Sequence, residues 1–142
     1  MKCAVVDVGS NTIRLSVYQT EGKNFRQLFT SKETTGLASY ISHHRMEKDG
    51  MLCAAAALNK FRSILEQFEI DRTEVFATAS LRNIDNSNEV VMELFRETGY
   101  QIKVLSGHEE ALCDFYGVMY NIYIDTGMIF DIGGGSTELV TF

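Results

Sequence analysis

The sequence predicts an α/β fold with a mixed sheet, and two observations support this prediction. Apolar runs suited to strands come before and between helical patterns, in the order β-β-β-α-β-α-β-α. A strand–turn–strand pattern at Val6–Leu15 then returns at Phe130–Leu139, with Asp7 and Asp131 standing 124 positions apart. Because helices connect the later strands, we expect those strands to be mostly parallel and the early strands to form an antiparallel edge.

Three strands are expected at the start of the chain, joined by turns at hairpin spacing. They cover residues 2–8, 13–18 and 25–30. Glu21–Asn24 supplies the glycine and asparagine of one turn. Residues 33–45 are polar and poorly periodic, so this stretch is interpreted as a loop.

Helices and short strands are then expected to alternate. A helix over residues 47–68 carries an apolar stripe at helical spacing. A second helix, over residues 88–97, ends at Gly99, and Ser106 begins a third that runs to Tyr120. The intervening strands are expected at residues 74–79 and 101–105, and those of the second copy at residues 128–131 and 137–142.

The repeated pattern suggests a division of the chain. Residues 1–125 are expected to form one domain, and residues 126–142 the opening hairpin of a second, similar domain. The strand at Thr137–Phe142 would then need a partner. That partner is either the first sheet or a second copy of the chain, which would make a homodimer.

Composition excludes several classes of protein. The 142 residues are 45% hydrophobic, which suits a packed core, and no apolar run approaches the roughly 18 residues of a membrane span. Met1–Asn11 reaches a charged residue without the apolar stretch of a signal peptide. The net charge of −6 argues against a nucleic-acid-binding surface. The three cysteines are interpreted as reduced core thiols of a cytoplasmic protein.

The first candidate site is the turn that comprises Gly9, Ser10, Asn11 and Thr12. Its glycine allows close approach to a ligand, and its polar residues supply hydroxyl, amide and N–H donors. Asp7, just before the turn, could hold a metal ion, and Arg14, just after it, could reach a phosphate. An ordinary hairpin turn is the alternative. The second copy favours two half-sites that face each other across a phosphate.

The second candidate site is the turn that comprises Gly133, Gly134, Gly135 and Ser136. Three successive glycines weaken a strand, and close passage of a phosphate chain is one reason to keep them. Asp131 and Glu138 flank the turn and could both bind Mg²⁺, directly or through water. The chain has no G-x-x-x-x-G-K-[ST] motif, and a strand follows the turn, so it is neither a Walker loop nor a Rossmann fingerprint.

Two further residues are candidates for chemistry. Ser106 and Glu109 have the spacing of a capping box, which leaves Glu110 free to orient and deprotonate a water. Alternatively, Glu110 only complements the helix dipole. Arg82 follows a strand end and suits a phosphate oxygen, with a surface salt bridge as the alternative.

With these segments the chain resembles the exopolyphosphatase / guanosine pentaphosphate phosphohydrolase family, in the fold group of acetate kinase, sugar kinases, Hsp70 and actin. The motifs D-x-G-S-N-T-x-R-L, A-T-x-x-L-R, S-G-x-E-E-A and D-I-G-G-G-S-T-E-L run in the family's order from Asp7 to Leu139. The last two are specific, whereas the first is looser. The resemblance implies a ribonuclease H-like fold in two related halves, with the active site between them. It also implies Mg²⁺-dependent release of the terminal phosphate of polyphosphate or guanosine pentaphosphate.

By position, the resemblance matches Glu110 to the base for the attacking water and Arg82 to an arginine that contacts phosphate. Asp131 and Glu138 match metal-linked acids, and the two turns match phosphate-cradling loops. Family members continue beyond the second loop, so the activity of this chain alone stays open. One alternative is a kinase of the same fold group, against which the Ser106–Ala111 motif argues. The other is a module that binds an alarmone or a partner protein without catalysis.

Overall fold

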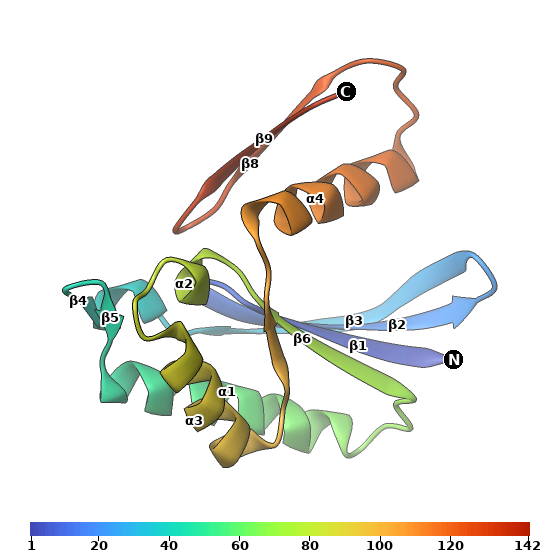
Figure 1. Ribbon diagram of the computed structural model, residues 1–142. Coiled ribbons are helices and arrows are strands. Elements are labelled where there is room, and N and C mark those ends of the chain that lie inside the picture. The colour runs from blue at the N-terminus through green and yellow to red at the C-terminus, as the bar shows by residue number, and fades with distance from the viewer.

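The computed structural model describes residues 1–142 and contains a central five-stranded sheet (Figure 1). Its strands are β1 (Lys2–Val8), β2 (Thr12–Glu21), β3 (Asn24–Thr34), β6 (Arg72–Ala77) and β7 (Ile102–Val104). Their order across the sheet is β3-β2-β1-β6-β7. The first three strands pair antiparallel, whereas β6 is parallel to β1 and β7 is parallel to β6. The predicted antiparallel edge that leads into a parallel sheet is therefore confirmed.

Two helices cover one face of this sheet, α1 (Lys48–Leu65) and α3 (Ser87–Thr98) (Figure 1). Alternation in β1 and β2 directs every second side chain towards the core, and Val6, Val8, Ile13 and Leu15 are fully buried. The apolar stripe of α1 packs against them, with Leu58 and Phe61 also fully buried. The core thus lies between the sheet and the α1–α3 layer.

The stretch at residues 33–45 is not the simple loop that its composition predicted. β3 continues to Thr34, and a 3₁₀ helix η1 (Leu37–Tyr40) and two short strands, β4 (Ile41–Ser42) and β5 (Arg45–Met46), follow. Asn86, far along the chain, accepts a hydrogen bond from the Met46 amide at 2.9 Å and donates one to its carbonyl at 3.1 Å. Because such distant contacts define this segment, local periodicity could not reveal it.

One short helix, α2 (Ala79–Arg82), was also not expected. It forms a single turn after β6, and its side chains up to Leu81 are buried. The Ser80 hydroxyl donates a 2.5 Å hydrogen bond to the Val8 carbonyl at the end of β1. This turn therefore joins the ends of two parallel strands and places Arg82 beside them.

The last helix and the C-terminal hairpin lie on the other side of the sheet (Figure 1). They are α4 (Gly107–Asn121), β8 (Met128–Ile132) and β9 (Thr137–Thr141). β9 pairs with β8 in a separate two-stranded sheet and does not add to the five-stranded one. Rings of Phe115 and Phe142 meet edge to face at 5.1 Å and help to hold the hairpin on α4.

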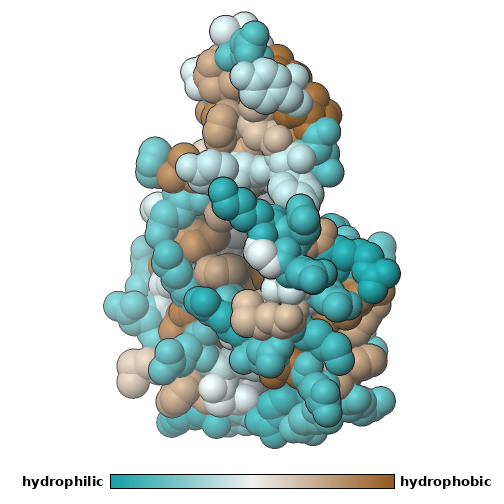
Figure 2. All heavy atoms as spheres, turned by 90° about the vertical axis from the view of Figure 1, so that its right-hand side faces the viewer, coloured by the Kyte–Doolittle hydropathy of each residue, from teal (hydrophilic) through white to brown (hydrophobic).

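The side chains of α4 and of the β8–β9 hairpin are much more exposed than those of the core. No residue of α4 is buried, and Phe130, Ile132 and Leu139 of the hairpin are 62%, 78% and 56% exposed. Figure 2 shows apolar residues at the narrow end of the molecule, mixed with polar ones. The hairpin is therefore held by backbone pairing and a few contacts rather than by a core of its own.

The cysteines form no disulfide, as expected, but Cys113 is exposed on α4 and is not the core thiol that its neighbours predicted. Cys3 and Cys53 are partly buried. None of the helices combines the length and the apolar character needed to cross a lipid bilayer.

Candidate active site

The two glycine-bearing turns have the same closure. In the first loop (Gly9–Thr12) the Gly9 amide donates to the Thr12 carbonyl at 3.2 Å. In the second loop (Gly133–Ser136) the Gly133 amide donates to the Ser136 carbonyl at 3.0 Å. The repeated sequence therefore folds into a repeated local structure.

These loops meet face to face. A Cβ atom added to Gly134 would contact Asn11 Cβ at 3.6 Å, which is an ordinary packing distance. A Cβ atom added to Gly135 would overlap the Ser10 hydroxyl and would lie 3.3 Å from Ala79 Cβ. A side chain at residue 135 would therefore force Ser10 to shift, and glycine allows the loops to approach this closely.

A cavity of about 310 Å³ lies where the loops meet. Its lining includes all residues predicted to bind phosphate, namely Gly9, Ser10, Asn11, Thr12, Arg14, Gly133, Gly134, Gly135 and Ser136. Asp7, Asp131 and Glu110 line the same cavity, as do Thr78 and Ala79 after β6. The structure thus brings together residues that are more than 120 positions apart in the chain.

Backbone donors in both loops are available to an anion. In the first loop the Ser10 carbonyl accepts from Ala38, and the Asn11 carbonyl accepts from Thr35 and Gly36. The amides of Ser10 and Asn11, by contrast, donate to no backbone carbonyl, nor do those of Gly134 and Gly135. Adjacent N–H groups of this kind make a concave anion-binding surface.

Glu110 lies on the cavity wall because of how α4 begins. Ser106 and Glu109 form the predicted capping box, in which the Ser106 hydroxyl accepts from the Glu109 amide at 3.2 Å. The Glu109 carboxylate accepts from the Ser106 amide at 2.9 Å and pairs with Lys103 at 2.7 Å. The Lys103 and Ser106 hydrogen bonds lower the pKa of Glu109 to about 2. Glu109 is thereby occupied, and Glu110 is left to face the loops.

Arg82, which was expected to contact phosphate or to form a surface salt bridge, is instead bound to two acids and a carbonyl. Its guanidinium donates to Glu110 at 2.5 Å, to Glu138 at 3.3 Å and to the Leu105 carbonyl at 3.1 Å. It is 21% exposed and is not part of the cavity lining. The salt-bridge alternative is therefore present, but as a largely buried link between α2, α4 and β9 and not as a surface pair.

Of the acids predicted to bind a metal, Asp131 and Glu138 lie directly opposite each other in the hairpin. Asp7 lies in the cavity opposite Arg14 and outside this pair. Burial raises the pKa of Asp7; Arg14 opposes that rise, while Glu110 and Asp131 add to it.

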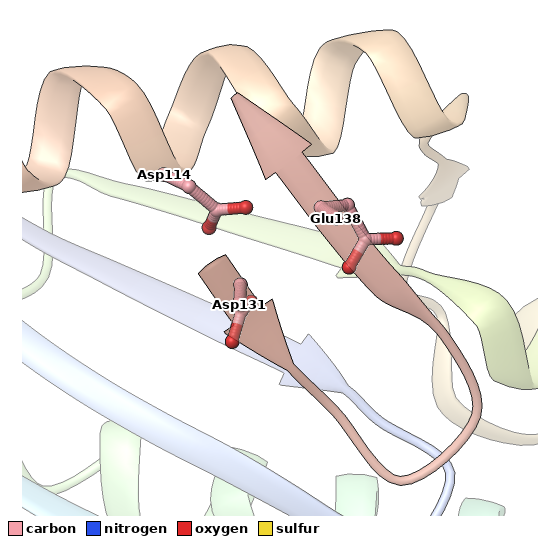
Figure 3. A group of neighbouring side chains, drawn as sticks. All are labelled: Asp114, Asp131 and Glu138. Atoms are coloured by element: carbon pink, nitrogen blue, oxygen red, sulfur yellow. The ribbon is translucent and has the colours of Figure 1, made fainter. Parts of the chain in front are cut away.

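Sequence reasoning missed one acid of the site, Asp114. Ligand oxygens of Asp114, Asp131 and Glu138 all lie within 4.8 Å of one another (Figure 3). Burial raises the pKa of Asp114 to about 6, and the charges of Asp131, Glu110 and Glu138 contribute. Its spacing from Glu110 could have indicated Asp114 as a site residue, because it follows Glu110 by four positions and lies on the same face of the helix.

The chain matches the Ppx/GppA phosphatase family over residues 16–142. It is 28% identical to the bifunctional 3-dehydroquinate synthase/phosphatase of Fusobacterium nucleatum, over 95% of this chain and 22% of that protein. An exopolyphosphatase from Cytophaga hutchinsonii superposes with a TM-score of 0.91 at 26% identity, over 99% of this chain and 46% of the other. The Ppx/GppA phosphatase of Aquifex aeolicus gives 0.86 at 25% identity, over 100% and 48%.

The chain thus spans about half the length of these solved structures and about a fifth of that curated relative. The agreement covers the mixed sheet, α4 and the C-terminal hairpin, because nearly the whole chain superposes. This confirms the predicted fold, that of the actin, sugar-kinase and Hsp70 group, and the predicted resemblance. The chain belongs to the Ppx/GppA phosphatase family.

Proposed function

We propose that this chain carries the first part of a phosphoanhydride hydrolase that removes the terminal phosphate of polyphosphate or guanosine pentaphosphate. The observation that carries the proposal is the cavity between the two loops, with unpaired backbone amides on both sides and Glu110 on its wall. The structures similar to this chain include one described as an exopolyphosphatase, which supports polyphosphate as the substrate class.

In this proposal the loops hold the terminal phosphates. The amides of Ser10, Asn11, Gly134 and Gly135 are fixed by their turns, so they can bind oxyanions without reorganising. Arg14 adds a positive charge to the first loop. Phosphoryl transfer depends mainly on such positioning and electrostatic stabilisation.

Glu110 is the proposed general base. It lies in the cavity and is held by Arg82 at 2.5 Å, so its carboxylate has a defined direction. From there it can accept a proton from the water that attacks the terminal phosphorus, while the remaining phosphate chain leaves. Arg82 orients this carboxylate, and its proposed contact with phosphate would place positive charge near the transferred group.

The residues also fit a divalent cation. The donors are all carboxylate oxygens, which hard cations such as Mg²⁺ prefer, and two of them are buried without a hydrogen bond, Asp114 Oδ2 and Glu138 Oε2. A bound cation would neutralise negative charge on the phosphates. We propose Mg²⁺ as that cation, because the family resemblance implies it.

The separate β8–β9 sheet and its exposed apolar side chains are consistent with residues 126–142 starting a second domain. On this proposal the active site lies between a first domain, residues 1–125, and the hairpin of the next.

Glu110→Gln tests the assignment of the base. We expect phosphate release from polyphosphate to fall by about 10²- to 10⁴-fold with substrate affinity little changed, because the amide cannot accept the proton. The neighbouring Glu109→Gln is the matched control and should keep most of the activity, since Glu109 caps α4 and pairs with Lys103 outside the cavity, and glutamine can also complete a capping box.

Three outcomes would contradict the proposal. If Glu110→Gln lost substrate binding but kept its turnover, Glu110 would not be the general base. Formation of ADP from ATP in place of phosphate release would indicate a kinase. Binding of guanosine pentaphosphate with no phosphate released would favour a module that binds without catalysis.

A further inference from the structure

The starting observation is that α4 directs two acids towards the hairpin. Glu110 and Asp114 are one helical turn apart, and α4 packs against both β8 and β9. Glu110 is taken by Arg82, whereas Asp114 reaches the space beside Asp131 and Glu138 (Figure 3). Three carboxylates from three elements therefore lie together, each with an oxygen within 4.8 Å of the other two.

This group of three (Asp114, Asp131 and Glu138) contains three carboxylates but makes only one ion pair with a cationic side chain. That ion pair joins Arg82 to Glu138 Oε1 at 3.3 Å. Glu138 is only 8% exposed, and its other oxygen, Oε2, is buried and has no hydrogen-bond partner. Asp114 Oδ2 is buried and unpartnered as well.

An uncompensated buried carboxylate is costly, and two beside each other are more so. Hydrogen bonding elsewhere in the protein satisfies nearly all such atoms. The unpartnered oxygens of Glu138 and Asp114 both belong to the group of three, so a ligand of positive charge would satisfy them together. The group offers only oxygen donors, which indicates a hard divalent cation rather than zinc.

We infer that Asp114 is the third protein ligand of a divalent cation that it shares with Asp131 and Glu138. This inference rests on the proposed function and adds a ligand to it, because only Asp131, Glu138 and Asp7 were assigned from the sequence. Asp7 is outside the group of three. In this arrangement the cation also ties α4 to the hairpin, since Asp114 lies on the helix and the other two ligands lie on β8 and β9.

The test measures Mn²⁺ binding directly, by the loss of the electron paramagnetic resonance signal of free Mn²⁺ on titration with the 142-residue chain. We expect Asp114→Asn to weaken the apparent Kd at least tenfold, since it removes a charged ligand. Asp125→Asn is the matched control, because Asp125 is exposed in the connector after α4 and should leave the Kd unchanged.

Thermal unfolding gives a second readout. Mn²⁺ at a hundredfold excess over its Kd should raise the Tm of the unaltered chain by about 5–10 °C. Without metal, Asp114→Asn should unfold at a higher temperature than the unaltered chain, because it relieves repulsion within the group of three. With metal, its rise in Tm should be much smaller. A variant that simply misfolds would show a lower Tm under both conditions.

The outcomes separate this inference from the proposed function. If Asp131→Asn and Glu138→Gln weaken Mn²⁺ binding while Asp114→Asn does not, Asp114 is not a ligand. The proposed function would then keep Asp131 and Glu138 as its metal ligands. If the unaltered chain binds no Mn²⁺, the inference is overturned, whereas phosphate release that depends on Glu110 would still support the hydrolase.

Discussion

The two strand–turn–strand units, Val6–Leu15 and Phe130–Leu139, share a sequence pattern and a turn but not an environment. Each turn closes with the same amide-to-carbonyl hydrogen bond, at 3.2 Å in the first unit and 3.0 Å in the second. In each unit the aspartate at the strand end lies opposite the residue that follows it by seven positions. Local sequence therefore determines the turn and the register, whatever surrounds them.

Charge distinguishes the units at that paired position. Asp7 lies opposite Arg14 in the first unit, and Asp131 lies opposite Glu138 in the second. Arg14 thus brings a positive charge suited to phosphate to the first side of the cavity. On the second side Asp131 lines the cavity, and its strand partner Glu138 adds a second acid suited to a cation. The repeat supplies one backbone frame for two kinds of half-site.

Burial distinguishes them further. Leu15 of the first unit is 0% exposed, whereas its counterpart in the second, Leu139, is 56% exposed. The first unit has β3, β6 and α1 beside it, whereas the strands of the second pack mainly against α4. Burial is therefore a property of the neighbours, and the repeated pattern alone does not determine it.

The largest expected effect tests this difference in burial. Leu15→Ala should lower the free energy of unfolding by about 2–5 kcal/mol, because it leaves a cavity in the core. Leu139→Ala, at the equivalent position, should change it by no more than about 0.5 kcal/mol. Urea unfolding of both variants measures the pair, and equal losses would show that the hairpin has a core of comparable strength.

A second prediction tests the contact between the units. Gly135→Ala should reduce phosphate release by about 10²-fold, since its methyl group overlaps Ser10 and pushes the loops apart. Gly117→Ala, in the middle of α4, meets nothing within 4 Å and is the control. It should keep full activity and gain about 0.5–1 kcal/mol of stability. Unchanged turnover in Gly135→Ala would mean that close approach of the loops is not needed.

The smallest expected effect tests the difference in charge. Arg14→Gln should raise KM by about tenfold with kcat little changed, because Arg14 contributes positive charge to binding rather than to the chemical step. Arg26→Gln, on an exposed part of β3, is the control and should alter neither constant. A fall in kcat with KM unchanged would assign Arg14 to the transition state instead.

Much of the fold could be predicted from the sequence because its strong signals are local. The apolar alternation of β1 and β2 and the stripe of α1 mark their elements directly. The segment at residues 37–46 could not be predicted in this way, because distant partners such as Asn86 hold it. α2 is a single turn, too short for any periodicity.

The candidate site shows the same limit. Both loops could be proposed as candidates because the repeat is visible in the sequence, and Glu110 because the capping box occupies its neighbour Glu109. Asp114 was missed because its role depends on the hairpin packing against α4, and no local pattern reports that packing. Arg82 could also be proposed, but its partners Glu110 and Glu138 lie 28 and 56 positions away and could not be predicted from local sequence.

The double ion pair of Arg82 has a consequence for the proposed general base, Glu110. The Arg82 guanidinium pairs with Glu110 of α4 and with Glu138 of β9 at the same time, so it links the helix to the hairpin. Movement of the hairpin away from α4 would break the ion pair with Glu138 and leave Arg82 and Glu110 less firmly held. If Glu110 is the base, hydrolysis would therefore depend on the hairpin being packed against α4.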